Sequence, residues 1–166
     1  MLVAIWAGIL DWRVRRIPNW LTVAGAVGGI AVNSALFGWS GLRAALLGLA
    51  LGLGLLLPFV LLRAIGAGDW KLAGALGACL GPGQLISVLI ATVFVAGLMA
   101  LVVVIYKGRL KQTLLNIVHV MAALFSLRMP PGDVSLDNPL STKIPLGVAM
   151  AAAVLIYGIG GAIGKI

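Results

Sequence analysis

The sequence predicts an all-α membrane protein: a polytopic bundle of about six transmembrane helices with one further amphipathic helix at the interface. Of the residues, 62% are apolar and only 10% are charged, and the mean hydropathy is +1.17, whereas a soluble domain carries about 25% charged residues. Period-two alternation, which a transmembrane strand would need, is absent. The 166 residues are expected to form a single integral membrane domain, 1–166, with no room for a separate soluble domain.

Six apolar runs are expected to form the spans: residues 1–10, 20–37, 44–62, 72–80, 85–106 and 144–163. The first covers ~15 Å as a helix, about half the hydrocarbon thickness, so either this span is incomplete or the natural chain begins upstream. It has no basic start and no small-residue cleavage site, so no signal peptide is predicted. The run 72–80 is too short to cross alone, but the Gly-Pro-Gly that follows it favours a turn. Glycines inside the runs are expected to let helices approach closely.

The stretch 107–143 is polar enough to need its own interpretation. Its apolar residues recur at helical spacing: Leu110, Leu114, Ile117, Met121, Leu124 and Phe125. This pattern predicts an amphipathic helix at the membrane interface, followed by the loop "RMPPGDVSLDNPLST". His119 is interpreted as a polar residue of that interface in preference to a proton shuttle.

The basic residues predict the orientation. If all six runs cross, ten of the twelve Lys and Arg residues fall on one side, and only Arg43 and Lys165 fall on the other. Basic loops stay inside, so the richer side is expected to face the cytoplasm and both termini the outside. The net charge of +8 is thereby explained by topology, and nucleic-acid binding is not predicted.

All four acidic residues are aspartates on the predicted cytoplasmic side. Asp133 and Asp137 lie in the polar loop, where a solvated carboxylate costs little. Asp11 and Asp69 each adjoin an apolar run, where an ionisable group suggests function. Two structural alternatives stay open: Asp11 could pair with Arg15 four residues on, and Asp69 could be the N-cap of the next helix.

Asp11 and Asp69 are more informative together. Both are predicted at the same depth on different helices, so they can converge in a bundle. Two carboxyl groups within a few ångströms do not both ionise easily, and the pair then shares one proton. The ionised member can take a proton from water while the other protonates a peptide carbonyl, as in aspartic proteases. This chemistry needs no metal and no cofactor, and none is predicted.

Three stretches carry a family resemblance: "DWRVRRIPNWLT" (11–22), "GAGDWKLAGALGACLG" (66–81) and "KIPLGVAMAAA" (143–153). In this order, on a six-run pattern, they resemble the motifs of the type IV prepilin peptidases, which are intramembrane aspartyl proteases with a Gly-x-Gly-Asp motif. The resemblance implies that Asp11 and Asp69 are the catalytic pair.

The resemblance also implies roles for neighbouring residues. Gly66 and Gly68 would allow close backbone approach beside Asp69, and Ile17, Pro18 and Asn19 would form the turn into the second span. Lys71 would either tune Asp69 or, as slightly favoured, extend toward lipid headgroups. The residues that the resemblance gives a supporting role are thus Gly66, Gly68, Lys71, Pro18 and Asn19.

The family cleaves the short basic leader of prepilins at the cytoplasmic face of the bacterial inner membrane, so the implied partners are prepilin peptides and the lipid bilayer. Larger members carry a cytoplasmic insert with paired cysteines, associated with methylation of the new pilin N-terminus. Here the only cysteine is Cys79, and none lies between the first two motifs. The chain is thus similar to the minimal type found with tight-adherence (Flp) pili.

Two other functional classes fit the sequence less well. A small transporter or channel could use intramembrane aspartates to relay protons or bind a cation, but it would favour acids near the mid-membrane and an internal repeat. An enzyme acting on lipid phosphates would suit the cationic side, yet no phosphate-binding glycine loop is found. The sequence does not determine the oligomeric state.

Overall fold

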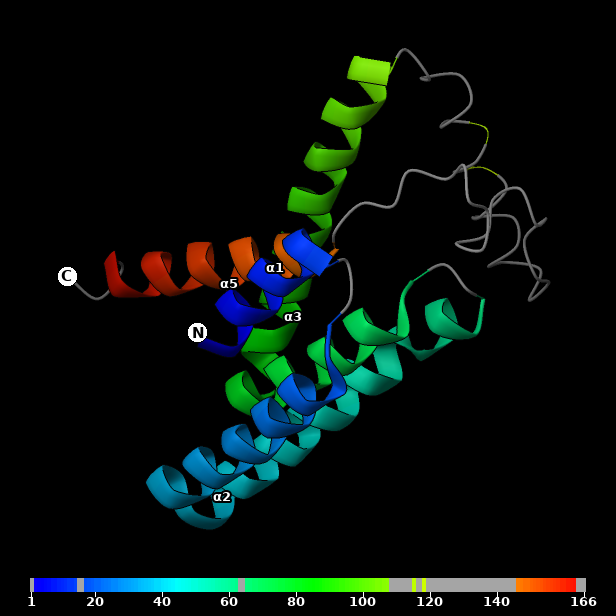
Figure 1. The fold of residues 1–166 in the computed structure, drawn as a ribbon. Coiled ribbons are helices and arrows are strands. Elements are labelled where there is room, and N and C mark those ends of the chain that lie inside the picture. Colours follow the sequence, from blue (N-terminus) through cyan, green and yellow to red (C-terminus); the bar gives the residue numbers. More distant parts are fainter. Residues whose placement is uncertain are drawn as a thin grey trace.

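The protein was analysed as a computed structural model, which describes residues 2–14, 17–62, 65–107, 115, 118 and 146–163. Four helices make up this part of the chain: α1 (Leu2–Val14), α2 (Asn19–Leu61), α3 (Ala67–Lys107) and α5 (Leu146–Ile163) (Figure 1). The described residues contain no strand, so the predicted all-α class is confirmed. The predicted interfacial helix and the loop after it fall almost wholly outside the described residues.

Both long helices are interrupted at a glycine. In α2 the break is at Gly38 (φ 59°, ψ −136°), and in α3 it is at Gly81 (φ 76°, ψ 172°), followed directly by Pro82. A positive φ is readily adopted only by glycine, and Pro82 has no N–H for the helical ladder. These breaks lie at "GWSGLR" and "GPGQ", where the sequence predicts connections between spans. The connections are therefore sharp corners without an intervening loop.

The chain reverses direction at both corners. A Cβ atom on Gly41 would collide with the carbonyl oxygen of Asn33, eight residues earlier in the chain. The two parts of α2 therefore pack against each other, as Figure 1 shows. After the second corner, a Leu85 methyl would lie 3.0 Å from a Cβ atom on Gly77, so the two parts of α3 pack together as well. Each part of α2 is then roughly 20 residues long, which matches one crossing of a bilayer.

Small residues set the relative directions of the segments. Gly25 and Gly29 lie against Ala75 and Cys79 respectively, so residues 19–37 run parallel to the first part of α3. Gly48 lies against Gly77 and Gly52 against Ala73, so residues 39–61 run antiparallel to it. At Gly29, Gly48 and Gly52 the backbones approach so closely that a side chain would collide with the opposite main chain. The predicted role of the glycines in close helix packing is confirmed.

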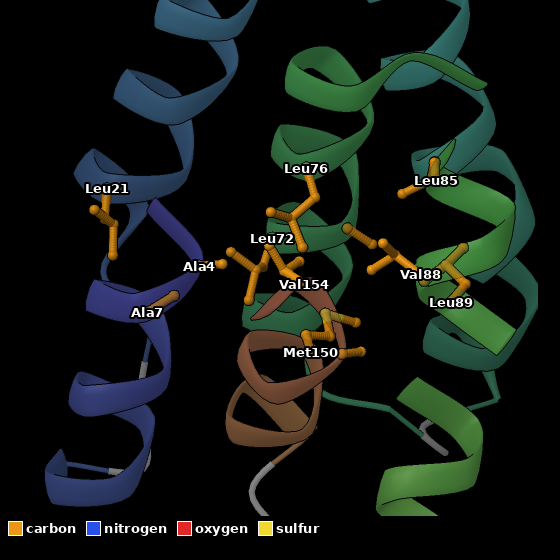
Figure 2. Close-up of a cluster of buried hydrophobic side chains, with 12 residues drawn as sticks. Ala4, Ala7, Leu21, Leu72, Leu76, Leu85, Val88, Leu89, Met150 and Val154 are labelled. Carbon is orange, nitrogen blue, oxygen red and sulfur yellow. The ribbon is translucent and has the colours of Figure 1, made fainter. Parts of the chain in front are cut away.

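α1 and α5 complete the bundle. The two helices pack side by side, and α5 also packs on α3 (Figure 1). The buried apolar cluster draws on every described helix (Figure 2). Its members are Ala4, Ala7, Leu21, Leu72, Ala73, Leu76, Leu85, Val88, Leu89, Met150, Ala153 and Val154. The small residues in this cluster keep the helices close together.

The outer surface of the bundle is apolar. α2 and α3 are each long and apolar enough to cross a membrane, and many of their large side chains point outward, such as Leu36 and Phe94. In water such a surface would be unfavourable, whereas in lipid it is the expected one. The number of six spans stays a prediction.

Candidate active site

Three stretches that are far apart in the sequence meet at one end of the bundle. Gly8 packs against Ala151 and Asp11 against Gly147, so α1 and α5 are antiparallel, and the end of α1 meets the start of α5. Gly68, at the start of α3, lies against Ile17 in the turn between α1 and α2. The three motif stretches singled out in the sequence therefore converge.

Asp11 lies in the last turns of α1 and is 7% exposed. Its Oδ2 accepts a hydrogen bond of 2.9 Å from the backbone N–H of Gly147. A Cβ atom on Gly147 would lie 2.9 Å from Oδ2, 3.0 Å from Cβ and 3.1 Å from Cγ of Asp11. Only glycine therefore fits at this position without displacing the carboxylate. Arg15, the ion-pair partner considered for Asp11, lies outside the described residues.

Asp69 lies in the first turn of α3 and is half-buried. Because α3 begins at Ala67, Asp69 is the third helical residue, and the hypothesis that it is the N-cap is wrong. The first turn is closed by the Trp70 N–H, which donates to the Gly66 carbonyl at 3.2 Å. The carboxylate lies over Gly66, since a Cβ atom there would be 3.2 Å from Asp69 Oδ2.

The two carboxyl groups are electrostatic neighbours. The charge of Asp11 acts directly on Asp69, which is also partly removed from solvent. Like charges at close range oppose simultaneous ionisation. The structure thus brings together, from α1 and α3, the two aspartates that the sequence singles out.

The turn between α1 and α2 holds the site together. Pro18 is extended (φ −66°, ψ 140°) and directly precedes α2, and its carbonyl accepts the Leu21 N–H at 3.2 Å. A Cβ atom on Gly68 would lie 3.3 Å from Ile17 Cβ. Gly68 therefore lies close to Ile17, and Pro18 directly precedes α2.

Lys71 differs from the expectation. Its ammonium donates a hydrogen bond of 2.9 Å to Oδ1 of Asn19, the first residue of α2. It therefore neither tunes Asp69 by a direct contact nor extends freely toward headgroups. Since Asn19 and Lys71 belong to different motifs, the bond ties the start of α2 to the start of α3.

Sequence reasoning missed two residues of this region. It included Gly147 in the third motif without a role, although an Ile-Pro-x-Gly pattern at a helix start signals a backbone constraint. It gave Trp70 no contact within the protein, whereas the indole Nε1 donates to the Leu53 carbonyl at 2.7 Å and links the second half of α2 to α3.

Some predicted residues lie outside the described part of the chain, namely His119, Asp133 and Asp137. Within the described residues, no group of three His, Cys, Asp or Glu side chains gathers to hold a metal ion. The chemistry available at this end of the bundle is that of two interacting carboxyl groups. One of them is held by a backbone N–H at a helix start.

Comparison with known proteins gives one match. The sequence profile of the type IV leader peptidase family matches residues 1–105. This range includes the first two motifs and both aspartates of the pair. Comparisons with curated proteins and with solved structures gave no significant match.

Proposed function

Because the chain belongs to the type IV leader peptidase family, and is therefore a peptidase, we propose that it is a membrane-embedded aspartic endopeptidase. It removes the short basic leader from prepilins of the Flp type. The observation that carries the proposal is the convergence of Asp11 and Asp69 at one end of the bundle, within range of mutual repulsion. The family match supports the substrate class, and the carboxylate pair supports the aspartic mechanism.

In the proposed mechanism the two carboxyl groups share one proton. The ionised group takes a proton from a water molecule as the water oxygen attacks the scissile carbonyl carbon. The protonated group gives its proton to the carbonyl oxygen, which yields a neutral tetrahedral diol. The newly protonated group then gives its proton to the leaving nitrogen while the other, now ionised, carboxylate takes a proton from one diol hydroxyl; the C–N bond breaks, the leader and the mature pilin are released, and the pair again shares one proton.

Several proposals about substrate and location rest on the sequence. No paired-cysteine insert separates the first two motifs, which supports a minimal enzyme without methyltransferase activity. The distribution of basic residues supports a site at the cytoplasmic face of the inner membrane, with several crossings and both termini outside. Transport is less well supported, because both aspartates lie at one end of the bundle and offer no path across it.

The test is leader cleavage by purified protein in detergent or vesicles, with a prepilin as substrate. Asp11→Asn and Asp69→Asn are each expected to lower the turnover by at least about 10²-fold, since each removes one proton-transfer group. Asp133→Asn and Asp137→Asn are matched controls and should retain full activity. Full activity of Asp11→Asn would refute the two-acid mechanism. Loss of folded protein in the Asn variants would instead assign the aspartates a structural role.

A further inference from the structure

The last helix contributes directly to the aspartate pair. α5 begins at Leu146, so the N–H of Gly147 belongs to the first turn and has no acceptor within its own helix. It donates instead to Oδ2 of Asp11, across 136 residues of sequence. Because a Cβ atom on Gly147 would lie within 3.1 Å of three Asp11 atoms, the contact leaves no room for a side chain.

This contact distinguishes the two carboxyl groups. A backbone N–H stabilises a carboxylate more than a carboxylic acid, and the start of a helix also favours negative charge. Asp69 lies at a helix start as well, but no hydrogen bond to its carboxylate is found among the described residues. The bonded group, Asp11, is therefore the better place for the negative charge.

Among the residues that the structure describes, the other charged groups around Asp11 do not reverse this order. α3 brings Asp69, whose charge opposes that of Asp11, and Lys71, whose ammonium is bonded to an asparagine of α2. On α1 itself Arg13 is exposed. α5 carries no charged residue within its bounds, and the only one on α2 is Arg43, which stacks on a tryptophan near the opposite corner.

We infer that Gly147 is a positioning residue that holds Asp11 as the proton-accepting carboxylate of the pair, so that Asp69 keeps the shared proton. The inference rests on the proposed peptidase function and assigns the two roles within it. Asp11 then activates water, and Asp69 protonates the scissile carbonyl oxygen. The third motif, which contains no acidic residue, thus acts on the catalytic pair through the backbone N–H of Gly147.

The first experiment compares pH profiles of cleavage for two alanine variants in the same interface. Gly147→Ala pushes the carboxylate off the N–H, so turnover should fall about 10²-fold. The acid limb of its profile, where turnover falls at low pH, should shift to higher pH by about one unit, because a hydrogen bond to the ionised carboxylate is lost. Gly8→Ala is the matched control, since its Cβ would lie 2.7 Å from Ala151 Cβ and touch no carboxylate.

Gly8→Ala is expected to lower thermal stability while keeping the wild-type position of the acid limb. The inference is overturned if Gly147→Ala keeps the wild-type acid limb, or if Gly8→Ala shifts it equally. Gly160→Ala, on the same helix with open space around it, should behave as wild type in both measurements.

A second measurement needs no variant of Gly147. Hydrogen exchange of its amide is followed in the wild type and in Asp11→Ala. Loss of the acceptor should speed exchange of this amide by at least about tenfold, while Asp11→Asn, which keeps a side-chain oxygen, should have a smaller effect. An unchanged rate in Asp11→Ala would overturn the inference. If the wild type cleaves no prepilin, the proposed function fails, and the exchange rates still decide whether the contact exists.

Discussion

Replacing Asn33 with leucine should loosen the corner at Gly81. The half-buried Asn33 side chain donates from Nδ2 to the carbonyls of Gly29 (3.0 Å), Ala78 (3.0 Å) and Cys79 (3.1 Å). In a regular helix the Ala78 carbonyl would accept from residue 82, which is a proline without an N–H. The asparagine amide therefore supplies the donor that the break in α3 removes.

The magnitude follows from the number of bonds lost across the helix pair. One NH₂ group has two donors, so the three acceptors share about two hydrogen bonds. Side-chain hydrogen bonds between membrane helices average about 0.6 kcal/mol and reach about 1.7 kcal/mol. Asn33→Leu keeps the side-chain volume roughly constant, so the loss of about two hydrogen bonds is its main effect. The free energy of unfolding of the variant should therefore be lower than that of the wild type by about 1–3 kcal/mol.

The assay is denaturant titration in mixed micelles, followed by helix content. Ser34→Ala is the matched control, because the Ser34 hydroxyl bonds only the Ile30 carbonyl of its own helix at 2.7 Å. Its stability should stay within about 0.5 kcal/mol of wild type. If Asn33→Leu is as stable as Ser34→Ala, the amide does not support the corner, and the argument is wrong.

Three further predictions concern contacts between the helices. Gly48→Val should destabilise the protein by about 1–3 kcal/mol, because the valine side chain would collide with the facing backbone. Gly54→Ala is the control and should be neutral, because Gly54 faces open space. Equal effects of the two substitutions would contradict the close packing at Gly48. Trp70→Phe should cost about 0.5–1.5 kcal/mol through loss of its indole hydrogen bond, and wild-type stability would count against that bond. A double-mutant cycle between Asn19 and Lys71 should give a coupling below about 1 kcal/mol, since the bond is exposed; a larger value would mean that the pair is shielded.

The sequence predicts the helical class and the site partners well, because both depend on strong local patterns. Apolar runs with few charges can only be helices of a bundle, and their ends follow from glycine and proline. Convergence of Asp11 and Asp69 follows from alternating crossings, which place both at one end. The corners at Gly38 and Gly81 are predicted as connections, although not as single-glycine breaks.

What the sequence leaves open depends on three-dimensional register. The bond from Gly147 to Asp11 requires knowing which faces of α1 and α5 meet, and apolar helices carry little periodicity to reveal this. The same holds for Lys71, whose partner depends on how the starts of α2 and α3 lie. The N-cap alternative for Asp69 stays open in the sequence because the glycines before it allow a helix start either at Ala67, as observed, or three residues later at Trp70.

The corners at Gly38 and Gly81 allow the orientation of the protein in the membrane to be determined by proteolysis. Both lie at the end of the bundle away from the aspartates, and each reverses the chain without an extended segment. A protease needs several residues of extended backbone to bind a cleavage site. A protease added on the side of the bundle where these corners lie should therefore leave residues 19–107 of the protein in sealed vesicles intact.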